Sequence, residues 1–180
     1  MISAWLPSSS RMGNSMKEAD NMVVVYESRT GFTKRYVDLL AAKAELEVYS
    51  VKELSRVDRN EEVIFFGWMR IGRIQGLTRL RGYNVIAVCC TGSGQKAEPD
   101  TETVIARNRL SGIPFFYMRG GCLPLKQIKG MDRVMLSMFV RMLKSRRDEE
   151  AKDAVSIIEN GLDAVKEENL QPLLEWLAAR

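Results

Sequence analysis

Short apolar runs that alternate with helix-like segments constrain the fold of this chain more than any other feature. Four runs, rich in β-branched and aromatic residues, cover residues 22–26, 62–68, 84–90 and 113–118. Because these runs are continuous rather than alternating, they are typical of strands buried on both faces of a parallel sheet. A fifth run, residues 46–49, alternates and is predicted to be an edge strand.

Apolar residues at helical spacing occupy segments between and after these runs. The spacing is present in residues 33–44, 76–81, 101–109 and 131–144. Strands that alternate with helices predict right-handed βαβ units in a three-layer α/β domain. The number and length of the strands predict a five-stranded parallel sheet with the order 2-1-3-4-5.

Composition divides the chain into three parts. Residues 1–21 are polar, Ser-rich and aperiodic, and they are predicted to be a flexible leader. Residues 22–147 contain all the predicted strands and are predicted to form the α/β domain. Residues 148–180 are predicted to be a C-terminal helical extension packed on the same domain, with one helix over residues 149–160 and another starting near Asn169.

The residue types that are absent or rare exclude several function classes. The chain has no histidine, which excludes a Ser-His-Asp triad and a His-ligated metal site, and we expect no metal. Its three cysteines, Cys89, Cys90 and Cys122, are too few and too unevenly spaced for a disulfide framework, so we expect reduced thiols. No apolar run approaches the roughly 18 residues that span a bilayer, and no secretory signal is recognised. We therefore expect a cytoplasmic protein, and no nucleic-acid partner.

Charge is distributed unevenly in the last third of the chain. Residues 119–147 carry eight Lys and Arg against one Asp, whereas residues 148–180 carry nine acids against three bases. Two interpretations stay open: the basic segment faces an anionic partner or membrane, or the two segments neutralise each other across the fold. The helix over residues 131–144 is predicted to cover the sheet and to bury four apolar side chains, those of Val134, Leu136, Met138 and Leu143. The basic segment 133–147 is predicted to add a patch for peripheral membrane contact at the inner face of the membrane.

A phosphate site is predicted where the first strand ends and the first helix begins. The segment there reads Ser28-Arg29-Thr30-Gly31-Phe32-Thr33. The unpaired N–H groups and the positive dipole end of the helix can bind an anion without a metal. The hydroxyls of Ser28, Thr30 and Thr33 can add donors, and Gly31 lets the backbone close around the anion. The patterns of a nucleotide-hydrolysing P-loop and of a dinucleotide-binding loop are both absent.

The spacing of Ser28, Thr30, Gly31 and Thr33 resembles the FMN-phosphate loop of flavodoxins. This resemblance implies a flavodoxin-like fold, FMN as the cofactor, and a flavin ring held by the loops after the third and fourth strands. The corresponding residues here are Trp68, Met69, Arg70 and Ile71 in the first loop and Thr91, Gly92, Ser93 and Gly94 in the second. Trp68 is predicted either to stack on the ring or to be a core or rim aromatic, and Arg70 or Arg73 to lie near the electron-rich edge.

Residues 115–121 and 130–145 resemble the flavodoxin-domain group that includes menaquinone-dependent protoporphyrinogen oxidase. The resemblance implies electron transfer or a flavin-dependent oxidoreductase, with a redox partner protein or a quinone. Whether the chain is an enzyme stays open, because no catalytic residue can be named. The long insertion that the oxidase carries after its fourth strand is absent, since only residues 91–112 separate the last two predicted strands.

Two alternatives of other classes stay open. The chain can be a flavodoxin-fold interaction protein without flavin. It can also be a phosphatase that uses the Cys90 thiolate, although Lys96 occurs near the place where such a loop needs an arginine. The oligomeric state, the electron donor and the electron acceptor cannot be derived from the sequence.

Overall fold

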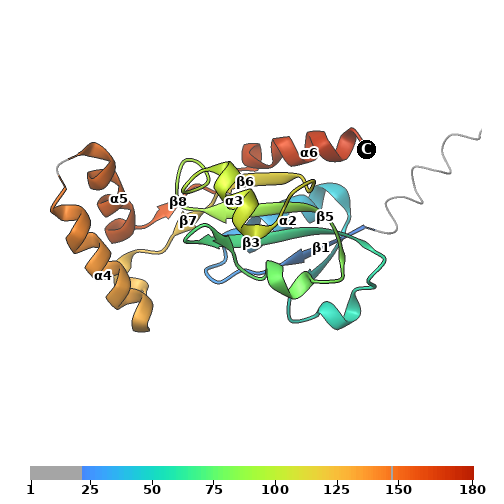
Figure 1. Ribbon diagram of the computed structural model, residues 1–180, viewed down its shortest axis with the longest axis horizontal. Helices are drawn as coiled ribbons and strands as arrows, with labels where there is room; N and C mark the ends of the chain where they lie inside the picture. Colours follow the sequence, from blue (N-terminus) through green and yellow to red (C-terminus); the bar gives the residue numbers. More distant parts are fainter. Residues whose placement is uncertain (1–21, 147) are drawn as a thin grey trace, which may run out of the picture.

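The computed structural model describes residues 22–146 and 148–180 (Figure 1). The predicted leader, residues 1–21, lies outside the described residues. No helix in the described ranges is both long enough and apolar enough to cross a bilayer.

A parallel sheet forms the centre of the molecule and has the predicted order. Its strands run in the spatial order β2-β1-β3-β5-β6, and each neighbouring pair is parallel. The strands are β1 (Met22–Tyr26), β2 (Glu47–Ser50), β3 (Glu62–Arg70), β5 (Asn84–Gly92) and β6 (Phe115–Arg119). The predicted α/β class and strand order are therefore confirmed.

One further strand, which the sequence pattern did not predict, extends the sheet beside β3. Strand β4 (Arg73–Ile74) pairs antiparallel with the end of β3. The turn between them contains Ile71 and Gly72, with φ angles of 50° and 70°. A two-residue strand is too short to give an apolar periodicity, so this hairpin becomes visible only in the fold.

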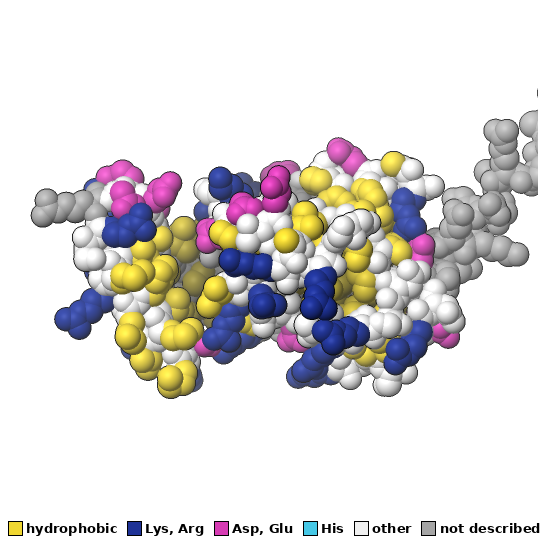
Figure 2. Space-filling model, in the orientation of Figure 1, with side chains coloured by type: hydrophobic (Ala, Val, Ile, Leu, Met, Phe, Trp, Pro, Cys, Tyr) yellow, Lys and Arg dark blue, Asp and Glu magenta, His cyan; other side chains and the backbone are white. Residues whose placement is uncertain are grey.

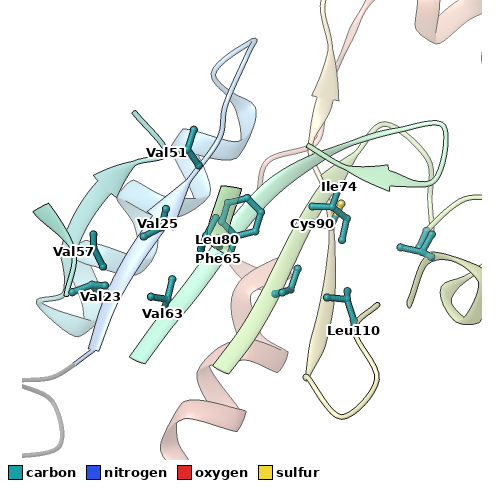
Figure 3. Packing of buried hydrophobic residues seen from close by; sticks show 13 residues of the cluster. Val23, Val25, Val51, Val57, Val63, Phe65, Ile74, Leu80, Cys90 and Leu110 are labelled. Atoms are coloured by element: carbon teal, nitrogen blue, oxygen red, sulfur yellow. The ribbon is translucent and has the colours of Figure 1, made fainter. Parts of the chain in front are cut away.

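Helices cover both faces of the sheet and complete the three layers. On one face, α3 (Thr101–Asn108) and the 3₁₀ turn η2 (Leu77–Leu80) pack against side chains of β1, β3 and β5. Figure 3 shows Val23, Val25, Val63, Phe65 and Cys90 within this core. The other face is covered by α2 (Phe32–Ala44) and α6 (Gln171–Ala178). The predicted helix over residues 76–81 is thus a 3₁₀ turn.

Helix α4 (Gly130–Lys144) does not cover the sheet, so that prediction is wrong. It packs on α5 (Glu149–Asn160) through Val140, Leu143 and Ile158. The two helices form a hairpin beside the sheet (Figure 1). Of the four side chains predicted to be buried, Leu143 is buried and Leu136 is half-buried, whereas Val134 and Met138 are 52% and 69% exposed.

Residues from the end of the chain, rather than α4, help to cover the sheet. Leu170 and Leu173 are fully buried against β3, β5 and α2. The apolar spacing of α4 identified an amphipathic helix correctly, but spacing alone does not determine which element a helix packs on. Helix α4 lies in the predicted α/β domain and α5 in the predicted extension, which begins at residue 148. Their packing therefore joins the two predicted parts. The domain boundaries themselves stay a prediction.

A two-stranded ribbon connects the α4–α5 hairpin to the sheet. Strands β7 (Gly121–Cys122) and β8 (Leu162–Asp163) pair antiparallel, so the chain leaves and re-enters the sheet at one place. The buried Tyr36 of α2 contacts the chain on both sides of the hairpin. Its hydroxyl donates to the Arg119 carbonyl at 2.6 Å and accepts from the Asn169 amide. The ion pair between Arg35 and Asp163, at 2.6 Å, adds a second link.

Candidate functional site

The loops after β1, β3 and β5 all leave the carboxyl edge of the parallel sheet. Strands β1 and β3 are neighbours, and so are β3 and β5, so the three loops adjoin one another. This edge is where ligands bind in open α/β sheets. The sequence predicted its site residues in these same three loops.

The first loop places an uncapped helix terminus at this edge. Gly31 precedes α2 with a φ of 91°, a left-handed conformation that favours glycine, and as the N-cap residue it provides no capping side chain. The Lys34 N–H points to Ser28 Oγ at a long 3.3 Å. Within the described ranges, the N–H groups of Phe32 and Thr33 donate to no acceptor. A Cβ at Gly31 would meet nothing within 4 Å, so the space above the loop is open.

Thr33 is held inside the protein rather than at the surface of the loop. Its side chain is 2% exposed, and its hydroxyl lies 2.7 Å from the hydroxyl of Thr91, which is also buried. Thr91 Oγ1 also lies 3.4 Å from the carbonyl of Gly67. The first turn of α2 is therefore hydrogen-bonded to the end of β5, while Thr30 is exposed.

Phe32 also turns away from the open side of the loop. Its ring lies against the start of β7, so close that a Cβ at Gly121 would come within 2.5 Å of Phe32 Cε1. The side chain thus packs the beginning of α2 against the ribbon that carries the α4–α5 hairpin. Its place in the predicted loop is structural, since only its backbone N–H faces the helix terminus.

A cleft of about 450 Å³ opens between the loops after β3 and β5. Five of the eight residues predicted in the two loops line it: Met69, Ile71, Gly92, Ser93 and Gly94. This volume falls in the range of small-molecule sites. The cleft therefore brings most of the predicted ring-binding residues together, whereas the phosphate loop lies outside its lining.

Five lining residues were missed by the sequence reasoning: Gly72, Glu98, Pro99, Arg107 and Tyr117. Tyr117 lies near the carboxyl end of β6, so the rule that parallel strands end at a shared edge could have found it. Its hydroxyl donates to the Gly94 carbonyl at 2.9 Å, and burial raises its pKa, which keeps it a neutral donor. Arg107 comes from α3, and no sequence signal marks it.

A second group of side chains surrounds Trp68 at the end of β3. The guanidinium of Arg29 lies 5.9 Å from the centre of the Trp68 ring, within cation–π range. Asp132, at the start of α4, forms ion pairs with Arg29 and, at 3.5 Å, with Arg70. Within the described ranges the indole N–H of Trp68 is buried and has no acceptor. Asp132 is a further residue that the sequence did not assign to the site.

Cys90 is placed where it cannot act as a nucleophile. Its side chain is fully buried in the core, and burial raises the pKa of its thiol. A reactive thiolate needs a lowered pKa and access to substrate. This geometry contradicts the phosphatase alternative.

Comparison with known proteins agrees with the architecture. Residues 23–150 match a family model described as a flavodoxin domain. The chain belongs to the flavodoxin-domain family. No curated protein matches this flavodoxin-domain chain. Among solved structures it is similar to a flavodoxin from the domain Archaea, with 16% sequence identity, a TM-score of 0.33, and coverage of 54% of this chain and 77% of that chain.

The flavodoxin-domain match extends from β1 through α4 and ends at the start of α5. Helix α6 lies beyond it, although Leu170 and Leu173 complete the core on one face of the sheet. The matched segment contains all three loops of the candidate site.

Proposed function

We propose that this flavodoxin domain binds FMN at the carboxyl edge of its sheet and acts in electron transfer or as a flavin-dependent oxidoreductase. The observation that carries the proposal is the start of α2, whose Phe32 and Thr33 N–H groups have no acceptor within the described ranges and which shares the carboxyl edge of the sheet with the cleft. One region offers donors for a phosphate, and the next offers a cleft for a ring. The proposal assigns the two regions to the two ends of one ligand.

The phosphate would be held by the first turn of α2. Backbone N–H groups at the start of a 13-residue helix have no partner within the helix, and the helix dipole favours an anion there. Thr30 is exposed beside them and can donate its hydroxyl. The left-handed Gly31 leaves open space on this side. Thr33, which is bonded to Thr91, would position the turn rather than contact the phosphate.

The orphan donor of Trp68 supports a ligand rich in acceptors. A buried N–H without an acceptor costs about 1–3 kcal/mol. Trp68 lies beside Arg29 of the phosphate loop, so a ligand that spans the loops after β1 and β3 could satisfy this N–H. This donor set, together with the open helix terminus, fits a phosphorylated flavin.

The ring would occupy the cleft between Met69 and the backbone of Gly92 to Gly94. A Cβ at Gly92 would come within 2.6 Å of Tyr117 Oη, so glycine is needed to keep the loop against the end of β6. Arg107 contributes positive charge to the cleft lining, and a cation near a flavin favours its anionic reduced form. When bound, the flavin supplies the hydride or single-electron chemistry.

We also propose a likeness to the menaquinone-dependent protoporphyrinogen oxidase group, with a redox partner protein or a quinone as the electron-transfer partner. The segment between β5 and β6 consists of a loop and α3, without a long insertion beside the cleft. We therefore propose flavin chemistry without assigning porphyrin as the substrate.

One observation favours the flavin-free alternative. Arg29 and Arg70 both pair with Asp132, so part of the positive charge of the site is already offset within the protein. A titration of the purified chain with FMN, followed by flavin fluorescence, distinguishes the two functions. Saturable one-to-one binding supports the proposal. A protein that is purified without flavin and takes up no added FMN would instead be an interaction protein.

A further inference from the structure

Helix α4 exposes a continuous apolar stripe along its whole length. Six large apolar side chains on it are between 44% and 75% exposed: Met131, Val134, Met135, Met138, Phe139 and Met142. Figure 2 shows hydrophobic side chains gathered over the α4–α5 hairpin, with Lys and Arg beside them. Isolated exposed apolar residues are ordinary, but a contiguous patch marks an interaction surface.

The stripe is separate from the face that packs on α5. Four of its positions, residues 131, 135, 138 and 142, follow helical spacing and lie on one side of the helix. Val140 and Leu143 lie on another side and are buried against α5. The hairpin therefore has its own small core, and the residues of the stripe are not part of it.

Unpaired positive charge accompanies the stripe. Arg133 and Arg141 lie on the polar side of α4, and within the described ranges neither forms an ion pair. Lys126 and Lys129, just before the helix, are exposed and also lack an acidic partner there. The acidic residue of the helix, Asp132, is turned to Arg29 and Arg70 of the sheet domain. The free surface of α4 is thus apolar and basic.

We propose that α4 docks on a lipid surface that carries anionic headgroups. An amphipathic helix with Met and Phe on one face and Arg on the other can lie in the membrane interface, with its apolar face in the acyl region and its cations at the headgroups. The helix has 15 residues, so it would lie on the bilayer. This inference does not depend on flavin binding.

A second copy of the chain fits the same surface less well. A symmetric dimer would place the same patch on both partners. Arg133 and Arg141 would then flank the shared surface on both partners, and α4 has no acidic residue left to offset them, because its Asp132 pairs with Arg29 and Arg70. An anionic bilayer complements both the stripe and the arginines. It also accepts a convex helix without needing a groove of matching shape.

The test is co-sedimentation of the purified full chain with vesicles of phosphatidylcholine alone or mixed with phosphatidylglycerol. We expect binding to the mixed vesicles, weakened by salt because its electrostatic part is screened. Met135→Gln with Met138→Gln should lower the partition coefficient by roughly tenfold. Ser137→Gln, on the polar side of the same helix, is the matched control and should leave it unchanged.

The charge contribution is tested in the same assay. Arg133→Gln with Arg141→Gln should lower the partition coefficient on mixed vesicles by roughly twentyfold. The double variant Arg79→Gln and Arg81→Gln, on exposed positions of the sheet domain, makes the same charge change away from α4 and should have little effect. Circular dichroism of every variant checks that the fold is retained.

Three results would overturn the proposal. The first is that the chain does not bind mixed vesicles. If the chain is also a monomer, an acidic protein would then be the partner of α4. The second is equal vesicle binding by the chain and the methionine double variant. The third is a dimer in sedimentation equilibrium that the methionine substitutions dissociate, without vesicle binding, because a second copy then covers the stripe.

Discussion

The hydroxyl oxygens of Thr33 and Thr91 lie 2.7 Å apart in the core, where they join the first turn of α2 to the end of β5. The two residues belong to different segments of the candidate site. Their contact fixes the position of the proposed phosphate turn relative to the proposed ring cleft. Nearby Thr30, by contrast, is exposed and free to contact a ligand.

The two threonines of the loop should therefore respond differently to substitution. Thr33→Val removes a buried hydrogen bond and should lower the free energy of unfolding by about 1–2 kcal/mol. Thr30→Val changes an exposed side chain and should stay within about 0.5 kcal/mol of the original stability. Urea denaturation measures both. Equal effects would mean that Thr33 does not hold the loop.

Tyr36 should contribute to stability through its hydroxyl. Tyr36→Phe leaves the ring in the core but removes the bonds to the Arg119 carbonyl and the Asn169 amide, so we expect a loss of about 1–2 kcal/mol. Tyr26→Phe is the control, because its hydroxyl has no hydrogen bond within the described ranges. Thermal or urea unfolding of the two variants measures this difference in stability. An unaffected Tyr36→Phe would contradict the proposed link from α2 to the end of β6 and to Asn169.

The three cysteines should differ in their reactivity with a thiol reagent. Cys89 and Cys90 are fully buried, so in the folded protein only Cys122, which is half-buried, should react. Burial raises the pKa of Cys122 above its ordinary value of 9.0, so its rate should keep rising as the pH passes 9.0. Counting modified thiols with and without urea measures this. Fast modification of Cys90 in the folded state would revive the phosphatase alternative.

The sheet could be predicted because its strands are buried on both faces. The runs at residues 22–26 and 84–90 are continuous for that reason, and alternation with helices then limits the topology to few orders. The predicted bounds differ from the observed ones by up to about two residues at each end. The β7–β8 ribbon could not be predicted, because each strand has two residues and its partner lies about 40 residues along the chain.

The partner of α4 could not be predicted either. Its apolar residues occupy two sides of the helix, one against α5 and one exposed, so its pattern is that of a core helix. The weaker pattern near Leu170 and Leu173 belongs to the residues that fill the sheet. Burial depends on which helix reaches the sheet, and the two-stranded ribbon directs α4 away from it.

The candidate site also contains residues that the sequence could predict and residues that it could not. Its three loops follow from the topology of a parallel sheet, so Gly31, Met69 and Gly92 could be selected from the sequence. Arg107 and Asp132 come from helices far along the chain, and only the fold brings them to the edge. That the side chain of Thr33 faces the core could not be read from the loop pattern either.

The most direct test of the central proposal compares FMN with riboflavin, which lacks the phosphate, on the original chain and on Thr30→Ala. A hydrogen bond to a charged group contributes about 1.5–3 kcal/mol, so Thr30→Ala should weaken FMN binding by roughly tenfold to a hundredfold and leave riboflavin binding unchanged. Thr78→Ala, at an exposed position on η2, should change neither. An FMN affinity unaffected by Thr30→Ala, or a parallel loss of riboflavin affinity, would contradict a phosphate held at the start of α2.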